Sequence, residues 1–289
     1  MNLSNKSIQK FSLHIYISLP DSDLFMKNII LILIFNVGMF SQNFSGTSLK
    51  RDSLHIYAND KKVNDAYLWT AFFNEKSNPY LIELLEKWNI KTLFLSVNPT
   101  MDLEKLKSFQ TLAAEKDIKI DFLIGENSYA EETDGFIHLE KVMLMGKNLG
   151  FKGIHLDIEP HTFDDYEENK DLYSKIQKKL FNNAKKWCDK NGMDLSVSVP
   201  MYLPIKVAKT LGRNNITTHI MAYGNSSLDH KLDQTQAMRK VLNSNSRWAF
   251  EINDFSDYQS LKETETKLIE KEITEFTYHD LSQLDALKK

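Results

Sequence analysis

The sequence predicts an α/β protein that folds as a single (β/α)8 barrel. Eight short apolar runs of strand length alternate with amphipathic stretches in which apolar residues recur every three or four positions. The connections between these segments are short, and about 247 of the 289 residues follow position 42, close to the roughly 250 residues of a typical barrel. Strand-then-helix units in this number favour a closed parallel sheet surrounded by helices.

The expected strands are rich in β-branched and aromatic residues, which favour an extended backbone. They cover residues 66–73, 91–98, 118–125, 153–159, 194–200, 217–223, 247–252 and 275–280. Helices are expected between them wherever apolar residues follow helical spacing. The clearest cover residues 103–112, 172–184 (ending before Asn191-Gly192), 232–242 and 261–269.

Missing motifs, the net charge and the cysteine content argue against several other classes of protein. A doubly wound open sheet is the alternative fold, but no G-x-G-x-x-G follows an expected strand and no G-x-x-x-x-G-K-[ST] occurs, so no nucleotide cofactor is expected. The net charge is −3 and no block of Lys and Arg alternates with aromatic residues, which argues against a nucleic-acid partner. The only cysteine, Cys188, excludes a disulfide framework, and its helical spacing predicts a packed thiol.

The N-terminal segment predicts export. From Met26 the chain has one Lys, an apolar run from Ile29 to Phe40, and then small and polar residues. This run of 12 residues is shorter than the roughly 20 needed to span a bilayer and is typical of a signal peptide. We expect residues 1–25 to be an upstream extension foreign to the protein, 26–42 a signal peptide and 43–289 the barrel domain. A membrane anchor or a buried helix is the alternative. The expected product is secreted or periplasmic, with no stable membrane span after signal removal.

The carboxyl ends of barrel strands, with the loops that follow them, usually form the functional site. In this sequence those positions carry carboxylates, amides and aromatic rings. Aromatic rings stack on the faces of sugar rings, and polar side chains bind sugar hydroxyls, so we expect a carbohydrate partner. The residues expected to contact it are Trp69, Asn98, Glu126, His161, Met201, Asn225, Glu251 and His279.

The expected fourth strand carries ionisable residues within an apolar run. His155, Asp157 and Glu159 alternate with apolar residues, so their side chains share one face. Asp157 and Glu159 are about 7 Å apart at two residue rises, and burial with mutual repulsion should raise the pKa of one carboxyl. A carboxyl that stays protonated near neutral pH can act as a general acid. We expect Glu159 to be that acid and His155 to be structural. The alternative for the carboxyls is a structural hydrogen-bond network.

The same strand resembles the motif of the family 18 glycoside hydrolases, the chitinase and endo-β-N-acetylglucosaminidase group. Their fourth strand carries D-G-x-D-x-D-x-E, which corresponds to residues 152–159. Gly153, Asp157 and Glu159 match, whereas Lys152 and His155 replace two aspartates.

The family's sixth strand carries Met-x-Tyr, matched here by Met221-Ala222-Tyr223. The resemblance implies a barrel that cleaves a glycosidic bond in glycans containing N-acetylhexosamine. It implies that Glu159 is the general acid, that Asp157 orients the N-acetyl group of the substrate, and that Tyr223 supports that group. The acetamide of the substrate is then the nucleophile, an exception to the two-carboxylate pattern. His155 stands where the family has an inner Asp, and whether it partners Asp157 is left open.

Two other functions are left open by the residues. A metal-dependent hydrolase would use the run from His155 to His161, which contains metal-ligand types. Residues that alternate along one strand, however, spread over about 20 Å, so we expect no metal. A non-catalytic carbohydrate-binding barrel is the second alternative. The presence of Glu159 speaks against it, since inactive relatives usually lose that residue.

Overall fold

The computed structural model describes residues 64–131 and 135–287. The predicted upstream extension (1–25), the predicted signal peptide (26–42) and the start of the predicted barrel domain lie outside these residues, so their assignment stays a prediction. Within the described parts of the chain, no helix is both long enough and apolar enough to cross a membrane.

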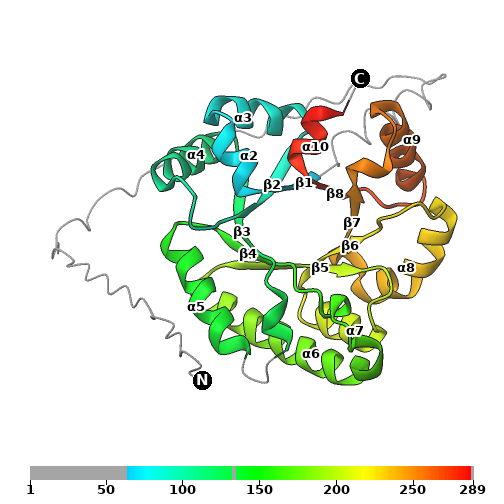
Figure 1. Ribbon diagram of the computed structural model, residues 1–289. Helices are drawn as coiled ribbons and strands as arrows, with labels where there is room; N and C mark the ends of the chain where they lie inside the picture. Colours follow the sequence, from blue (N-terminus) through cyan, green and yellow to red (C-terminus); the bar gives the residue numbers. More distant parts are fainter. Residues whose placement is uncertain (1–63, 132–134, 288–289) are drawn as a thin grey trace, which may run out of the picture. The chain divides into compact units, whose positions relative to one another are not determined.

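Eight parallel strands close into a barrel in chain order (Figure 1). Pairing of the last strand with the first, Phe276 opposite Asn64, completes the ring. The predicted (β/α)8 fold is therefore confirmed, and closure of the sheet excludes the doubly wound alternative. The strands are β1 (Asn64–Leu68), β2 (Ile90–Ser96), β3 (Lys119–Ile124), β4 (Gly153–Leu156), β5 (Asp194–Pro200), β6 (Thr217–Met221), β7 (Ser246–Glu251) and β8 (Phe276–His279).

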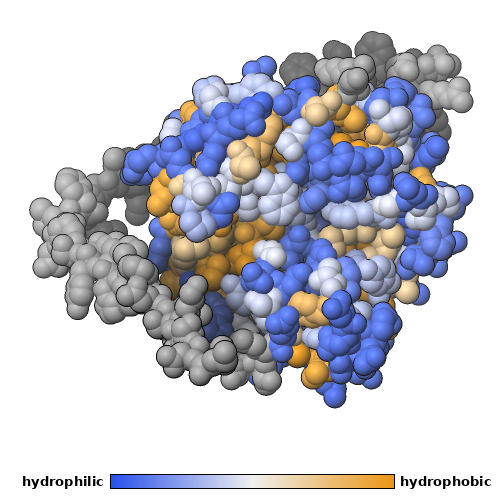
Figure 2. All heavy atoms as spheres, in the orientation of Figure 1, coloured by the Kyte–Doolittle hydropathy of each residue, from blue (hydrophilic) through white to orange (hydrophobic). Residues whose placement is uncertain are grey.

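Helices form the outer layer, with α5, α6 and α7 below the barrel and α8 and α9 to its right in Figure 1. In the same view, hydrophilic residues cover most of the outer helices and hydrophobic residues show between them (Figure 2). The four helices predicted from spacing correspond to α4, α6, α8 and α9. The helices are α2 (Thr70–Glu75), α3 (Asn78–Lys87), α4 (Leu103–Glu115), α5 (Gly135–Asn148), α6 (Tyr166–Asn191), α7 (Ile205–Arg213), α8 (Leu228–Leu242), α9 (Tyr258–Ile269) and α10 (Leu281–Ala286).

Local sequence signals account for several helix ends. Asp102 precedes α4 and its side chain accepts a hydrogen bond from the backbone N–H of Lys105 at 3.0 Å, as an N-cap residue does. Gly192 ends α6 with φ of 65°, a left-handed conformation that glycine adopts without strain. Cys188 is buried in α6, in agreement with the prediction of a packed thiol.

Two strands end at least three residues earlier than the sequence predicts. β1 stops at Leu68 because α2 begins at Thr70, which places Trp69 at the N-cap of a helix. β4 stops at Leu156, although the backbone N–H of Asp157 still donates to the carbonyl of Ile124 at 2.9 Å. Asp157 is therefore held at the end of the strand, and Glu159 lies in the turn beyond it.

The barrel has an apolar wall and a mixed interior. Leu156 and Ile158 are buried in the large core cluster formed with the helices, on the face opposite to that of His155 and Asp157. Tyr67, Phe94 and Leu123 form a separate cluster, against which Trp69 packs. The barrel interior also holds the buried histidines His155 and His219. His155 lies beneath the candidate site.

Candidate active site

His155 forms the floor beneath the candidate site and is fully buried. Its Nδ1 hydrogen-bonds to the Ser196 hydroxyl at 2.7 Å, while its Nε2 hydrogen-bonds to the hydroxyls of Tyr67 at 3.0 Å and Ser198 at 2.9 Å. Burial lowers the pKa of His155 to about 3, so the imidazole is neutral. Because hydroxyls occupy both ring nitrogens, the structure supports a structural role for His155 and leaves it unsuited to partner Asp157.

The Asp157 carboxyl is buried against Glu159 at the end of β4. Burial raises the pKa of Asp157 to about 8, and the charge of Glu159 and a hydrogen bond to its side chain contribute in the same direction. Asp157 therefore holds a proton near neutral pH and donates it toward the Glu159 carboxylate. Its Oδ1 is buried without a hydrogen-bond partner among the described residues.

Glu159 lies where the chain leaves the barrel, at the N-cap of the short helix η2 (Pro160–Thr162). Its backbone N–H donates to Asn127 Oδ1 at 2.7 Å, and its carbonyl accepts from the Thr162 hydroxyl at 2.7 Å. Asn127 Nδ2 also donates to that hydroxyl at 3.1 Å. The Glu159 side chain is 24% exposed, so its backbone is fixed while its carboxyl reaches solvent. Sequence reasoning did not select Asn127 or Thr162; the position of Asn127 just after a strand was the available signal.

Tyr223, His279, Glu251 and Trp69 form a second group at the same end of the barrel. Burial raises the pKa of Tyr223, and the charges of Asp157 and then Glu251 add to it, which places Tyr223 near both carboxyls. The His279 ring lies 5.7 Å from the Tyr223 ring and 5.8 Å from the Trp69 ring, between centroids. His279 Nδ1 hydrogen-bonds to Glu251 Oε2 at 2.9 Å. The strand-end positions thus bring these four side chains together with Asp157.

The other predicted contact residues have local partners. Asn98 accepts hydrogen bonds from the backbone and hydroxyl of Thr100, at 2.9 and 2.7 Å, and so stabilises its own turn. Glu126 caps η1 (Asn127–Ala130) through its side chain, and Met201 packs against the core. Asn225 is exposed and lines a separate cavity of about 330 Å³ with Lys231 and other residues of α8 and α9. These local contacts account for the four side chains in the structure, and their contact with a sugar stays a prediction.

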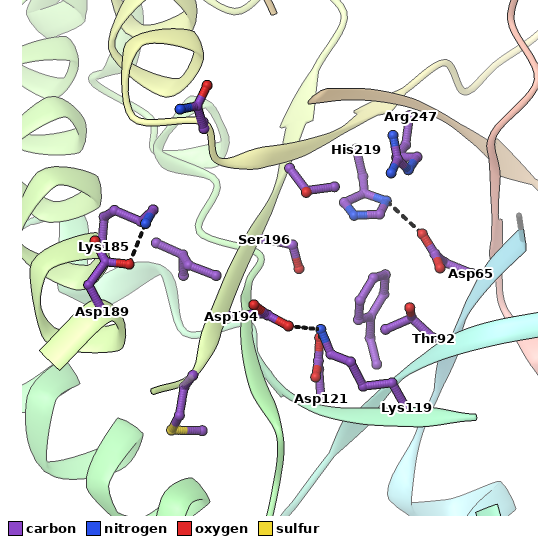
Figure 3. Close-up of a pocket in the computed structure, with 15 residues that line it drawn as sticks. Asp65, Thr92, Lys119, Asp121, Lys185, Asp189, Asp194, Ser196, His219 and Arg247 are labelled. Atoms are coloured by element: carbon purple, nitrogen blue, oxygen red, sulfur yellow. Dashed lines mark hydrogen bonds and ion pairs between the residues drawn. The ribbon is translucent and has the colours of Figure 1, made fainter. Parts of the chain in front are cut away.

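A polar cavity of about 340 Å³ lies at the opposite, amino-terminal end of the strands (Figure 3). Lys119 there lies 3.1 Å from Asp121 and 2.7 Å from Asp194, and His219 faces Asp65 at 3.9 Å. Burial raises the pKa of Asp65 to about 7 and that of Asp121 to about 6. Sequence reasoning missed this cluster because it depends on barrel closure bringing β1, β3 and β6 together.

The motif glycine, Gly153, belongs to this lower cluster. A Cβ at Gly153 would lie 2.5 Å from Asp121 Oδ1, so only glycine leaves room for the buried carboxyl. That oxygen is covered and lacks a hydrogen-bond partner in the described parts of the chain. Gly153 therefore serves packing inside the barrel, at the other end from the candidate site.

Residues 64–131 and 135–287 contain no group of three or more His, Cys, Asp or Glu side chains that could hold a metal ion. Within those residues, the run from His155 to His161 is therefore not assembled as a metal site.

Comparisons with known proteins identify the fold. No family model and no curated protein matches the chain. Among solved structures, a GH18 chitinase from Cycas revoluta in complex with (GlcNAc)3 matches with a TM-score of 0.58 and 10% identity, over 77% of this chain and 96% of that chain. The fold is that of the family 18 chitinases.

Further matches extend this result. The chitinase-like agglutinin from Robinia pseudoacacia has a TM-score of 0.55 and 11% identity, over 76% of this chain and 95% of that one. The spore cortex-lytic enzyme SleL of Bacillus megaterium has a TM-score of 0.54 and 12% identity, over 76% and 70%. The resemblance predicted from the β4 motif is thus confirmed at the level of fold. Because the matches include an agglutinin as well as chitinases, the chemistry must be argued from the site.

Proposed function

We propose that the protein is a glycoside hydrolase that cleaves a glycosidic bond with Glu159 as general acid and Asp157 as its partner. The observation that carries the proposal is the contact between the buried Asp157 carboxyl, whose pKa is raised, and the Glu159 carboxyl, which is 24% exposed. Such a pair stores a proton beside a group that reaches solvent. A purely structural network would instead satisfy Asp157 on both oxygens, whereas Oδ1 has no partner among the described residues.

Two polar groups without partners suggest the substrate class. The Tyr223 hydroxyl and Asp157 Oδ1 are both buried without hydrogen bonds in the described parts of the chain, and the charge of Asp157 acts on Tyr223. A hydroxyl donates and a carboxylate oxygen accepts, so together they match the carbonyl and N–H of an acetamide. This complementarity supports an N-acetylhexosamine as the sugar bound beside Glu159.

The proposed cleavage follows from these positions. The proton moves from Asp157 to Glu159 across their hydrogen bond, and Glu159 gives it to the glycosidic oxygen as the bond from that oxygen to the sugar carbon breaks. The acetamide oxygen of the substrate forms the new bond to that carbon. The Asp157 carboxylate accepts from the acetamide N–H, and Tyr223 donates to the acetamide oxygen before attack. In the second half, water replaces the acetamide oxygen and its proton returns to Glu159.

The test compares the parent protein with Glu159→Gln on paired sugars. An N-acetylglucosamine oligomer and the glucosamine oligomer of equal length differ only in the acetyl groups. We expect the parent to cleave the acetylated oligomer and Glu159→Gln to bind it without cleaving it. Glu140→Gln, an exposed position on α5, is the matched control and should cleave like the parent. Cleavage of both oligomers at equal rates would refute the acetamide role.

A non-catalytic carbohydrate-binding barrel is the second candidate. It is favoured by the structural match to an agglutinin and by the neutral His155 in place of a motif aspartate. It predicts that parent and Glu159→Gln bind the acetylated oligomer equally, with no product from either.

A further inference from the structure

His161 lies beside the Glu159 carboxyl. Its Nε2 is 3.4 Å from Glu159 Oε2, and the two side chains are 15% and 24% exposed. Asp157 contacts Glu159 as well, so the Glu159 carboxyl lies between a carboxylic acid and an imidazole. The proposed chemistry assigns a role to Asp157 but leaves His161 without one.

The His161 ring is held in place by its surroundings. Pro160 begins η2, and the hydrogen bond from Thr162 to the Glu159 carbonyl fixes the turn that carries His161. The Tyr202 ring meets the imidazole edge-on with centroids 5.4 Å apart, and the Tyr166 ring lies at 6.4 Å. These ring contacts hold the imidazole with Nε2 at 3.4 Å from Glu159 Oε2.

We propose that His161 is a positioning residue that binds Glu159 Oε2 and thereby keeps the acidic proton of Glu159 on Oε1. This inference rests on the proposed function of Glu159. A carboxyl has two oxygens, and only a proton on the oxygen that faces the glycosidic bond is useful for acid catalysis. A ring N–H at Oε2 occupies one oxygen as an acceptor, so the proton resides on the other. The 3.4 Å separation is long for such a bond, and it is expected to shorten when substrate fills the site.

The charge state of His161 agrees with this role. Burial lowers the pKa of His161, and the charge of Glu159 opposes that effect only in part. A neutral imidazole donates from Nε2 without adding a positive charge that would suppress protonation of Glu159. The titratable groups around it are Asp157, Glu159, Tyr166, Tyr202 and the ion pair of Lys170 with Glu167.

The deciding experiment replaces His161 by Phe and by Gln in the full chain. His161→Phe keeps a planar ring against Tyr202 but removes the N–H donor. We expect kcat to fall roughly tenfold with KM nearly unchanged, less than the hundredfold or more expected on loss of the acid itself. The donor stabilises the Glu159 carboxylate, so its loss should also move the basic limb of the pH profile upward by roughly half to one pH unit. His161→Gln retains an N–H donor and should recover part of kcat.

Several outcomes separate this inference from its alternatives. His230→Phe, at an exposed histidine of α8, is the matched control and should leave kcat and the pH profile unchanged. A rise in KM at constant kcat would make His161 a sugar contact and overturn the positioning role. An unchanged pH limb in His161→Phe, or equal kcat in the Phe and Gln variants, would also overturn it. If Glu159→Gln is as active as the parent, the proposed function itself fails; if Glu159→Gln is inactive while His161→Phe matches the parent, only this inference fails.

Discussion

Replacement of Asp65 by Asn should make the protein more stable at pH 8 and leave its stability nearly unchanged at pH 4. Asp65 is 4% exposed on β1, and burial raises its pKa from 3.8 to about 7, against smaller opposing effects of Arg247 and Thr92. Because the folded pKa exceeds the unfolded one, the protonated carboxyl favours the folded state. Its contribution is complete below about pH 4 and is lost as pH rises through about 7.

The size of the effect follows from the two pKa values. A rise from 3.8 to about 7, at about 1.4 kcal/mol per pKa unit, corresponds to about 4 kcal/mol. Asn has the shape of Asp without the charge, so the variant should lack this loss of stability. Asp121 and Asp157 also have raised pKa values and contribute slopes of the same sign. The quantity of interest is therefore the difference between variant and parent.

Urea unfolding followed by circular dichroism from pH 4 to pH 8 measures this difference. Asp233→Asn, at an exposed position on α8, is the matched control and should run parallel to the parent. We expect Asp65→Asn to gain a few kcal/mol relative to the parent between pH 4 and pH 8. Parallel curves for Asp65→Asn and the parent would mean that both proteins lose the same stability between pH 4 and pH 8. That result would refute the reasoning.

Three further predictions concern other parts of the chain. Gly153→Ala places a Cβ 2.5 Å from Asp121 Oδ1 and should cost about 1–3 kcal/mol of stability, measured by thermal unfolding; unchanged stability would show that Asp121 is free to move. Asp157→Asn removes the carboxyl that shares a proton with Glu159, so it should slow turnover and move the basic limb of the pH–rate profile downward; a basic limb at the parent pH would contradict the shared proton. We also propose that the protein is exported, so mass spectrometry of native material should find an N-terminus beyond about residue 38, and a mature chain that retains Ile29–Phe40 would disprove it.

The order of strands was predictable because barrel strands are nearly continuous apolar runs. Each of the eight expected segments overlaps one strand of the barrel. Helix α5 was harder to recognise, since Ile137, Leu144 and Met145 are exposed and blur the helical period. β4 was predicted three residues too long because Asp157 and Glu159 continue the alternation after strand pairing has ended.

The sequence also predicted that one of two neighbouring carboxyls would have a raised pKa. Glu159 was expected to be that carboxyl, but the structure raises the pKa of Asp157 instead. The reason is burial, since the chain turns at Pro160 and leaves Asp157 inside while the Glu159 side chain is 24% exposed. The partners of His155 were not predictable, since Tyr67, Ser196 and Ser198 come from two other strands. Alternation places a residue on the inner face of a strand, but only the closed barrel determines which residues meet there.

If Glu159 delivers the proton that breaks a glycosidic bond, its loss should slow a single turnover of an N-acetylglucosamine oligomer. Product formation is measured with excess enzyme for the parent and for Glu159→Gln, with binding of the oligomer determined in parallel by calorimetry. We expect the variant to bind with similar affinity and to form product at least about a hundredfold more slowly. Equal single-turnover rates for the two proteins would contradict it.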